Sequence, residues 1–165
     1  MSENYKVIGK SVPKNDGRVK VTGQAKYTGD MKFPNMLVGK ILTSPYAHAK
    51  ILNIDTSEAE KLPGVKAIIT HEDVPDTKYG ISPARWDENI FCIDKVRFVG
   101  DKVAAVAAVD EETVYKALKL IKVEYEELPA VFDPVEALQE GAPELHEEFP
   151  GNVNTKIHQN FGDVE

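Results

Sequence analysis

The stretch 102–122, KVAAVAAVDEETVYKALKLIK, decides the fold of this chain. Its first part, Lys102–Val109, is a short apolar run that predicts a strand. Asp110 then favours a helix start, because an aspartate at this position accepts a hydrogen bond from a free backbone N–H. Apolar residues follow at helical spacing and predict one buried face, made of Val114, Ala117, Leu118 and Ile121. A strand that leads directly into an amphipathic helix is typical of an α/β domain.

Strand patterns continue on both sides of this stretch. We expect further strands at Met36–Thr43, Ala49–Asp55, Val65–Thr70, Lys95–Val99 and Val123–Tyr125. Met36–Thr43 is apolar on both faces, so we expect it to be central or sandwiched. Ser57 and Glu60 fit a capping box at the start of a short helix. The order strand, strand, helix, strand occurs twice and predicts a two-layer α/β (α+β) domain with mixed sheets and two main helices.

Composition divides the chain into three parts. Residues 1–30 are rich in Gly, Lys and Asp and predict an extended arm with turns at Asp16-Gly17 and Thr22-Gly23. Residues 31–140 hold the strand and helix patterns, with Gly100-Asp101 as a tight turn and a short helical turn at Val135–Leu138. Residues 141–165 are polar and without a period, and we expect a linker there.

Charge and hydropathy exclude several classes of protein. The 165 residues carry a net charge of −7. Residues 1–110 hold 16 basic and 14 acidic side chains, whereas residues 111–165 hold 4 and 13. No basic stripe is present, so nucleic-acid binding is not expected. The longest apolar run, Val103–Val109, is too short to span a bilayer, and the first residues lack a secretory pattern. These features predict a cytoplasmic protein that lies outside the membrane.

No catalytic constellation is evident in the sequence. Cys92 is the only cysteine, and its apolar neighbours favour a buried, unreactive thiol. The four histidines lack the spacing of a zinc pair, and no serine lies in a nucleophile elbow. The glycines form no phosphate-binding loop. We therefore expect no catalytic, cofactor-binding or metal-ligating residue in this chain.

The segment 72–89 is a long loop without a clear period, and long loops are often functional. It contains Arg85 and Trp86, residue types that interfaces favour. A contact with a partner and simple packing within the loop are two open interpretations of Trp86.

An ordered series of short motifs resembles the large subunits of xanthine dehydrogenase, aldehyde oxidase and 4-hydroxybenzoyl-CoA reductase. The series consists of Lys20-Val21-Thr22-Gly23, Ala25, Tyr27-Thr28, Asp30, Leu37, Ser44-Pro45, Ala47-His48-Ala49, Ile51, Asp55, Ala59, Pro63-Gly64-Val65, Asp73-Val74-Pro75, Val99-Gly100, Val103-Ala104, Val123, Tyr125, Leu128-Pro129, Asp133 and Ala137-Leu138. We interpret eight members as structural: Gly23, Tyr27, Asp30, Ser44, Pro45, Asp55, Gly64 and Gly100. Asp101 stands where the family often has glutamine, and Lys14 where it often has arginine, which leaves fine contacts open.

The resemblance implies an N-terminal hammerhead-type domain of a molybdenum-binding subunit. Enzymes of this family hydroxylate aldehydes or N-heterocycles with oxygen from water, or in one branch dehydroxylate reductively. Their cofactors are molybdopterin, two 2Fe-2S clusters and usually FAD, and the pterin contacts and general base lie downstream of this domain. The ending Phe161–Glu165 is similar to the opening of the next segment, so we expect a chain cut before the catalytic domains. The partners implied are the remaining molybdopterin-binding domains and the iron–sulfur and FAD subunits.

Two hypotheses from different classes follow. The first is a scaffold and assembly domain of a molybdenum hydroxylase that is inactive alone. The second is a free-standing module that binds a protein or small ligand through the 72–89 loop. A folded remnant without a function is a third.

Overall fold

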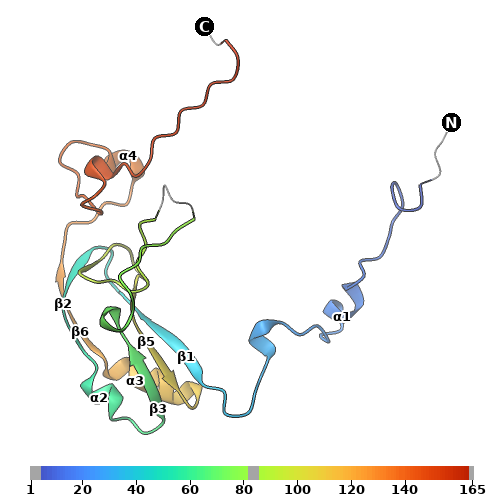
Figure 1. Cartoon of the computed structure of the whole chain (residues 1–165), viewed down its shortest axis with the longest axis horizontal. Coiled ribbons are helices and arrows are strands. Elements are labelled where there is room, and N and C mark those ends of the chain that lie inside the picture. The colour runs from blue at the N-terminus through green and yellow to red at the C-terminus, as the bar shows by residue number, and fades with distance from the viewer. Residues whose placement is uncertain (1–4, 82–85, 164–165) are drawn as a thin grey trace. The chain divides into compact units, whose positions relative to one another are not determined.

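The computed structural model describes residues 5–81 and 86–163. By its internal contacts the chain divides into two compact units, Met1–Met36 and Leu37–Glu165. The larger unit holds all the named strands (Figure 1). The division into an arm, a domain and a linker at residues 30 and 140 stays a prediction.

The first unit contains two short helical elements. Helix α1, Gly17–Val21, forms where the sequence predicts only a turn, and a 3-10 helix, η1, covers Thr28–Asp30. Thr22 Oγ1 donates to Arg18 O at 2.8 Å, and Gly23 follows with a φ of +70°. The expected turn at Thr22-Gly23 is therefore confirmed as the end of α1, because a positive φ suits glycine.

The second unit contains two three-stranded sheets. One has the order β1-β5-β3, with β1 at Val38–Thr43, β5 at Lys102–Ala108 and β3 at Val65–Ile69. The other has the order β4-β2-β6, with β4 at Lys95–Val96, β2 at Ala49–Asp55 and β6 at Lys122–Glu127. Figure 1 shows β1, β5 and β3 side by side, with α3 against their sheet.

Each connection between consecutive strands changes sheet, so the odd-numbered strands form one sheet and the even-numbered strands the other. All pairings among the named strands are antiparallel. The two-layer α/β class is confirmed, but the expected mixture of parallel and antiparallel strands is wrong. The helical connections carry the chain from one sheet to the other instead of returning it parallel within one sheet.

β1 differs from its expected place. It is an edge strand, and its residues alternate between half-buried and exposed, so one face is uncovered by the described residues. The expectation of a central or sandwiched strand is thus wrong for this structure. β4 is also shorter than predicted, because after Val96 the backbone N–H of Arg97 donates to Asp101 Oδ2 at 3.0 Å and the chain turns.

Helix α3, Glu111–Leu120, packs on the β1-β5-β3 sheet. Asp110 Oδ1 accepts from Thr113 N at 2.7 Å, which confirms the predicted N-cap. Val114, Ala117 and Ile121 are buried, and Leu118 is half-buried against the same core. The apolar face predicted from the sequence is therefore the face that joins helix to sheet.

The helix that precedes β3 starts differently from the prediction. α2 covers Ser57–Glu60 after Thr56, and Ser57 N donates to Asp55 Oδ1 at 3.0 Å. Glu60 Oε1 accepts from Thr56 Oγ1 at 2.6 Å. The predicted capping box of Ser57 and Glu60 is therefore wrong, because Ser57 is already the first helical residue, Thr56 is the N-cap, and Asp55 accepts from Ser57 N.

Shorter elements also occur among the described residues of the second unit. They are the 3-10 helix η2 at His71–Asp73, α4 at Pro134–Ala137 and the 3-10 helix η4 at Pro150–Asn152. In α4, Asp133 Oδ1 accepts from Val135 N and Glu136 N at 2.7 and 3.0 Å. No helix among residues 5–81 and 86–163 has the length and apolar character needed to cross a bilayer.

Candidate functional site

Three of the eight motif residues lie in the first unit and shape its backbone. Tyr27 N donates to Asp30 Oδ2 at 3.0 Å, which closes η1. Gly23 has open space around the position of an added Cβ, so its positive φ is what favours glycine there. None of the three contributes to a cavity described below.

Ser44 and Gly100 are brought together by the turn that follows β4. Gly100 N donates to Ser44 O, and Ser44 N donates to Asp101 O, each at 2.8 Å. The buried Ser44 Oγ also accepts from Tyr46 N at 2.9 Å, around Pro45. These contacts join the end of β1 to the entry of β5, so the Ser-Pro and Val-Gly motifs act as one corner of the fold.

Asp55 and Gly64 shape the two ends of the α2 connection. Hydrogen bonds from Ser57, side chain first and backbone second, lower the pKa of Asp55. Gly64 has a φ of +98° and its carbonyl accepts from Val109 N at 3.0 Å. Both residues therefore serve the backbone of the domain.

Trp86, the candidate interface residue, has 53% of its surface exposed. Arg85, its predicted companion, lies outside the described residues. This exposure does not distinguish contact with a partner from packing within the loop, so both interpretations of Trp86 stay predictions.

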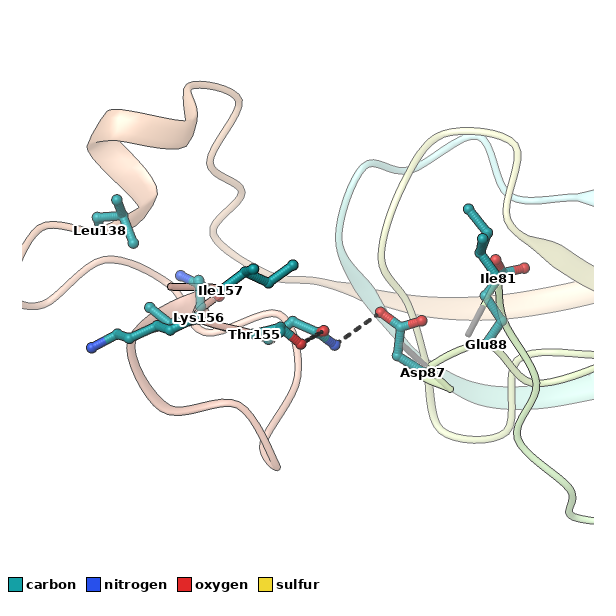
Figure 2. A pocket seen from close by; sticks show the side chains of 10 residues that line it. Ile81, Asp87, Glu88, Leu138, Thr155, Lys156 and Ile157 are labelled. Atoms are coloured by element: carbon teal, nitrogen blue, oxygen red, sulfur yellow. Dashed lines mark hydrogen bonds between the residues drawn. The ribbon is translucent and has the colours of Figure 1, made fainter. Parts of the chain in front are cut away.

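A cavity of about 700 Å³ lies between the 72–89 loop and the segment that follows η4 (Figure 2). On the loop side it is lined by Ile81, Asp87 and Glu88, and on the other side by Leu138 and residues 152–157. Asn154 Nδ2 donates to Asp87 Oδ2 at 3.5 Å across it. Among the described residues that line this cavity none is a buried nucleophile or base, so these residues could bind a ligand by contact but form no catalytic pair.

A second cavity of about 270 Å³ lies against the turn between β4 and β5. Its lining includes Asn89, Cys92, Arg97, Asp101, Lys102 and His146. Burial, and next the adjoining Asp101 carboxylate, raise the pKa of the Cys92 thiol far above its usual range. Because the thiolate is the nucleophilic form, Cys92 is unsuited to covalent chemistry at neutral pH.

Asp101 was missed as a key residue by sequence reasoning. Its two carboxylate oxygens accept from Arg97 N and Lys102 N, each at 3.0 Å. The carboxylate is thereby committed to the turn that begins β5. The signal available in the sequence was an aspartate directly after a turn glycine, a pattern that favours side-chain bonds to nearby backbone N–H groups.

Residues 144–148 are held to the body of the second unit by three contacts. Arg97 Nε donates to Leu145 O at 2.9 Å, and Lys95 Nζ lies 3.6 Å from Glu147 Oε1. Lys78 forms an ion pair with Glu148. Lys95 is notable because its side chain is only 9% exposed, whereas that of Glu147 is 83% exposed.

Asn152 fixes the fold of the same segment from within. Its Oδ1 accepts from Leu145 N at 2.9 Å, and its Nδ2 donates to Ala137 O and Pro143 O, each at 2.9 Å. One side chain thus connects α4, residues 143–145 and η4. Sequence reasoning missed this clamp, because an asparagine in a polar segment carries no distinguishing pattern.

The donor set of the described residues fits neither a protein-ligated metal ion nor an iron–sulfur cluster. Across residues 5–81 and 86–163, no three His, Cys, Asp or Glu side chains converge in a way that could hold a metal. An iron–sulfur cluster requires several cysteine thiolates, and the sequence has one cysteine.

Comparison with known proteins shows which family has this fold. The family described as "Aldehyde oxidase and xanthine dehydrogenase, a/b hammerhead domain" matches residues 22–129. The chain belongs to this family. The hammerhead match runs from the end of α1 to the residues just after β6, and confirms the resemblance drawn from the motif series.

Three relatives give the hammerhead chain its context. It is 48% identical over 151 residues to a probable xanthine dehydrogenase subunit of Bacillus subtilis (strain 168), covering 91% of this chain and 20% of that protein. It is 37% identical over 166 residues to the nicotinate dehydrogenase large molybdopterin subunit of Eubacterium barkeri, covering 100% and 38%. The solved aldehyde oxidoreductase of Desulfovibrio gigas superposes with a TM-score of 0.76 at 37% identity, covering 84% and 16%.

The hammerhead chain therefore spans between 16% and 38% of the length of these three relatives. Two of them are named as subunits, so they belong to larger assemblies.

Proposed function

We propose that the chain is the hammerhead domain of the molybdenum-binding subunit of a molybdenum hydroxylase. The observation that carries this proposal is the family match over residues 22–129, together with 48% identity to a subunit named for xanthine dehydrogenase. The reaction proposed for the whole enzyme is hydroxylation of an N-heterocycle or aldehyde carbon. Relatives named for xanthine and nicotinate favour the N-heterocycle.

Within such an enzyme the role of this chain is scaffolding and assembly, without activity of its own. The contacts of Ser44, Asp55 and Gly100 support this role, because each serves a turn or a helix end. Molybdopterin, iron–sulfur clusters and FAD belong, in this proposal, to other domains and subunits, which are the partners of the hammerhead domain. The single buried cysteine is compatible with the cytoplasm, where thiols stay reduced.

A domain exchange tests the proposal. In the Bacillus subtilis relative, the region that matches this chain would be replaced by residues 1–165, and the resulting protein purified with its partners. We expect molybdenum content and dehydrogenase activity on xanthine close to those of the unmodified enzyme. A version of the relative that lacks the region serves as the control. An exchanged protein that is folded and stable yet contains no molybdenum would contradict the proposal.

The second candidate is a ligand-binding module, and the 700 Å³ cavity beside the 72–89 loop is the observation that favours it. Trp86 is the only tryptophan and is half-exposed. It directly precedes Asp87, which lines this cavity, so its fluorescence reports on the loop. Titration of the isolated chain with xanthine and with nicotinate separates the two candidates. The scaffold role predicts no saturable change, and a saturable change that Asp87→Ala removes would favour the module.

A further inference from the structure

One face of the β1-β5-β3 sheet is uncovered among the described residues, and we call it the outer face. It consists of Gly39, Ile41, Ala67, Ile69, Ala105 and Ala107, which line a shallow groove of about 250 Å³. The opposite face of the same sheet packs on α3, through residues such as Ala104, Val106 and Ala108. The sheet is therefore apolar on both faces, although only one of them is covered.

The outer face lacks the polar side chains that water normally selects. An antiparallel sheet with one solvated face alternates apolar and polar residues. Here Ile41 is 50% exposed and Ile69 is 39% exposed, while the positions between them are alanine or glycine. Lys40 also lines the groove, but its ammonium lies 3.2 Å from Glu111 Oε1 and over the ring of Tyr115, both residues of α3. The charge of Lys40 is thus paired on the helix side of β1 and not in the groove.

The size of the groove indicates what kind of partner covers it. Stable complexes between separate proteins use roughly 20–30 residues a side, many more than the six of the outer face. A tethered partner needs far less area, because the connection supplies a high effective concentration. The hammerhead chain covers 20% of the Bacillus relative, so most of that protein lies outside the shared region.

We propose that the outer face is the docking surface for an apolar element from the rest of the same molybdenum-binding subunit. This inference rests on the proposed function and adds to it the surface through which the domain is attached. The small side chains of Gly39, Ala67 and Ala105 let a helix or strand approach the sheet closely, and Ile41 and Ile69 flank it. The occupant is neutral and apolar, because a charged group there would have no partner.

The exchanged Bacillus protein provides the test. Ala67→Arg places a guanidinium in the groove, and Ala67 is exposed in the isolated chain, so the fold itself should tolerate it. Ile41→Asp is the second variant. Lys66→Glu is the matched control, since Lys66 is the adjacent exposed residue of β3 and does not line the groove. Thermal melting of the isolated chain checks that each variant folds.

We expect Ala67→Arg and Ile41→Asp to lower the yield of molybdenum-containing enzyme roughly tenfold or more, because a buried unpaired charge is costly. Lys66→Glu should leave the yield unchanged, and all three isolated chains should melt near the parent. Full molybdenum content in both groove variants would overturn the inference while leaving the proposed function intact. A dimer of the parent chain that Ala67→Arg dissociates, with molybdenum content unchanged, would assign the face to a second copy and also overturn it. Failure of the unmutated exchange would instead count against the proposed function.

Discussion

Gly64 lies where the turn before β3 meets the start of α3. A Cβ added there would lie 3.0 Å from Val109 Cγ2 and 3.2 Å from Thr113 Cγ2. Gly100 has nearly the same φ, +99° against +98°, but open space around its Cβ position. The two glycines therefore separate the cost of backbone conformation from the cost of crowding.

We expect Gly100→Ala to destabilise the domain by roughly 1–2 kcal/mol, the cost of a positive φ for a residue with a Cβ. Gly64→Ala should cost clearly more, because Val109 and Thr113 must also move. Urea unfolding of both variants measures the difference. Equal losses in the free energy of unfolding would show that Val109 and Thr113 can move away from the added methyl group without cost.

Cys92 should resist alkylation in the folded chain. Its side chain is buried and its pKa is raised, first by desolvation and then by Asp101. Reaction with iodoacetamide at neutral pH should be at least about tenfold slower than in denaturant, because the thiolate is the reactive form. The unfolded chain is its own control, since Cys92 is the only cysteine. Comparable rates in the two states would place the thiol at the surface.

At the residue scale, the sequence predicts structural roles for the motif positions, but it could not predict their contacts. Asp110 was predictable because its partner, Thr113, is three residues away. The bonds from Gly100 to Ser44 and from Arg97 to Leu145 join residues far apart in the chain, and no local pattern encodes them. The same limit explains why Asn152 was missed.

At the scale of elements, helix α3 carries the contact between the layers. Val114 is fully buried in the core that α3 forms with the sheet. We expect Val114→Ala to cost about 2–3 kcal/mol, from lost burial of two methyl groups plus the cavity left behind. Val135→Ala in α4 is the matched control, because Val135 is 66% exposed and should change stability by less than about 0.5 kcal/mol. Similar losses at both positions would contradict the assigned buried face.

The elements with a clear period were the ones predicted well. β2 has the predicted bounds Ala49–Asp55, and α3 ends within a residue or two of its pattern. β4 was overestimated, because Arg97-Phe98-Val99 has strand-like residues but is turned away by Asp101. Side-chain capping thus overrode local propensity at that point.

At the scale of the whole second unit, segment 144–148 gives stability a dependence on pH. Burial, and next the positive charge of Arg97, lower the pKa of His146 from its ordinary value of 6.5. The folded state therefore favours the neutral imidazole, and the unfolded state binds a proton more readily. The resulting stability is fully present above the unfolded pKa and decreases as pH falls below it.

We expect the urea midpoint of the parent chain to fall between about pH 8 and pH 5.5 by more than that of His146→Asn, which cannot take up the proton. Carboxylates shared by both chains cancel in this comparison. If the urea midpoints of the parent and of His146→Asn changed equally with pH, the pKa of His146 would be the same in the folded and unfolded states.

The pairing of strands into sheets was beyond sequence reasoning. Period and propensity describe each strand's own faces, whereas sheet order depends on which distant strands meet, such as Val38 with Ala108. The hammerhead fold was nevertheless expected, because the motif series resembled a family whose members share it.

The alternation of strands between the two sheets has a consequence for a cut backbone. A break within the 72–89 loop separates β1, β2 and β3 from β4, β5 and β6. Each sheet then contains strands of both fragments, since β5 lies between β1 and β3, and β2 lies between β4 and β6. Neither half alone retains a paired sheet, so each fragment needs strands of the other to form either sheet. Because strands alternate between the two sheets, we expect the two fragments of a chain cut in this loop to stay associated and to unfold together.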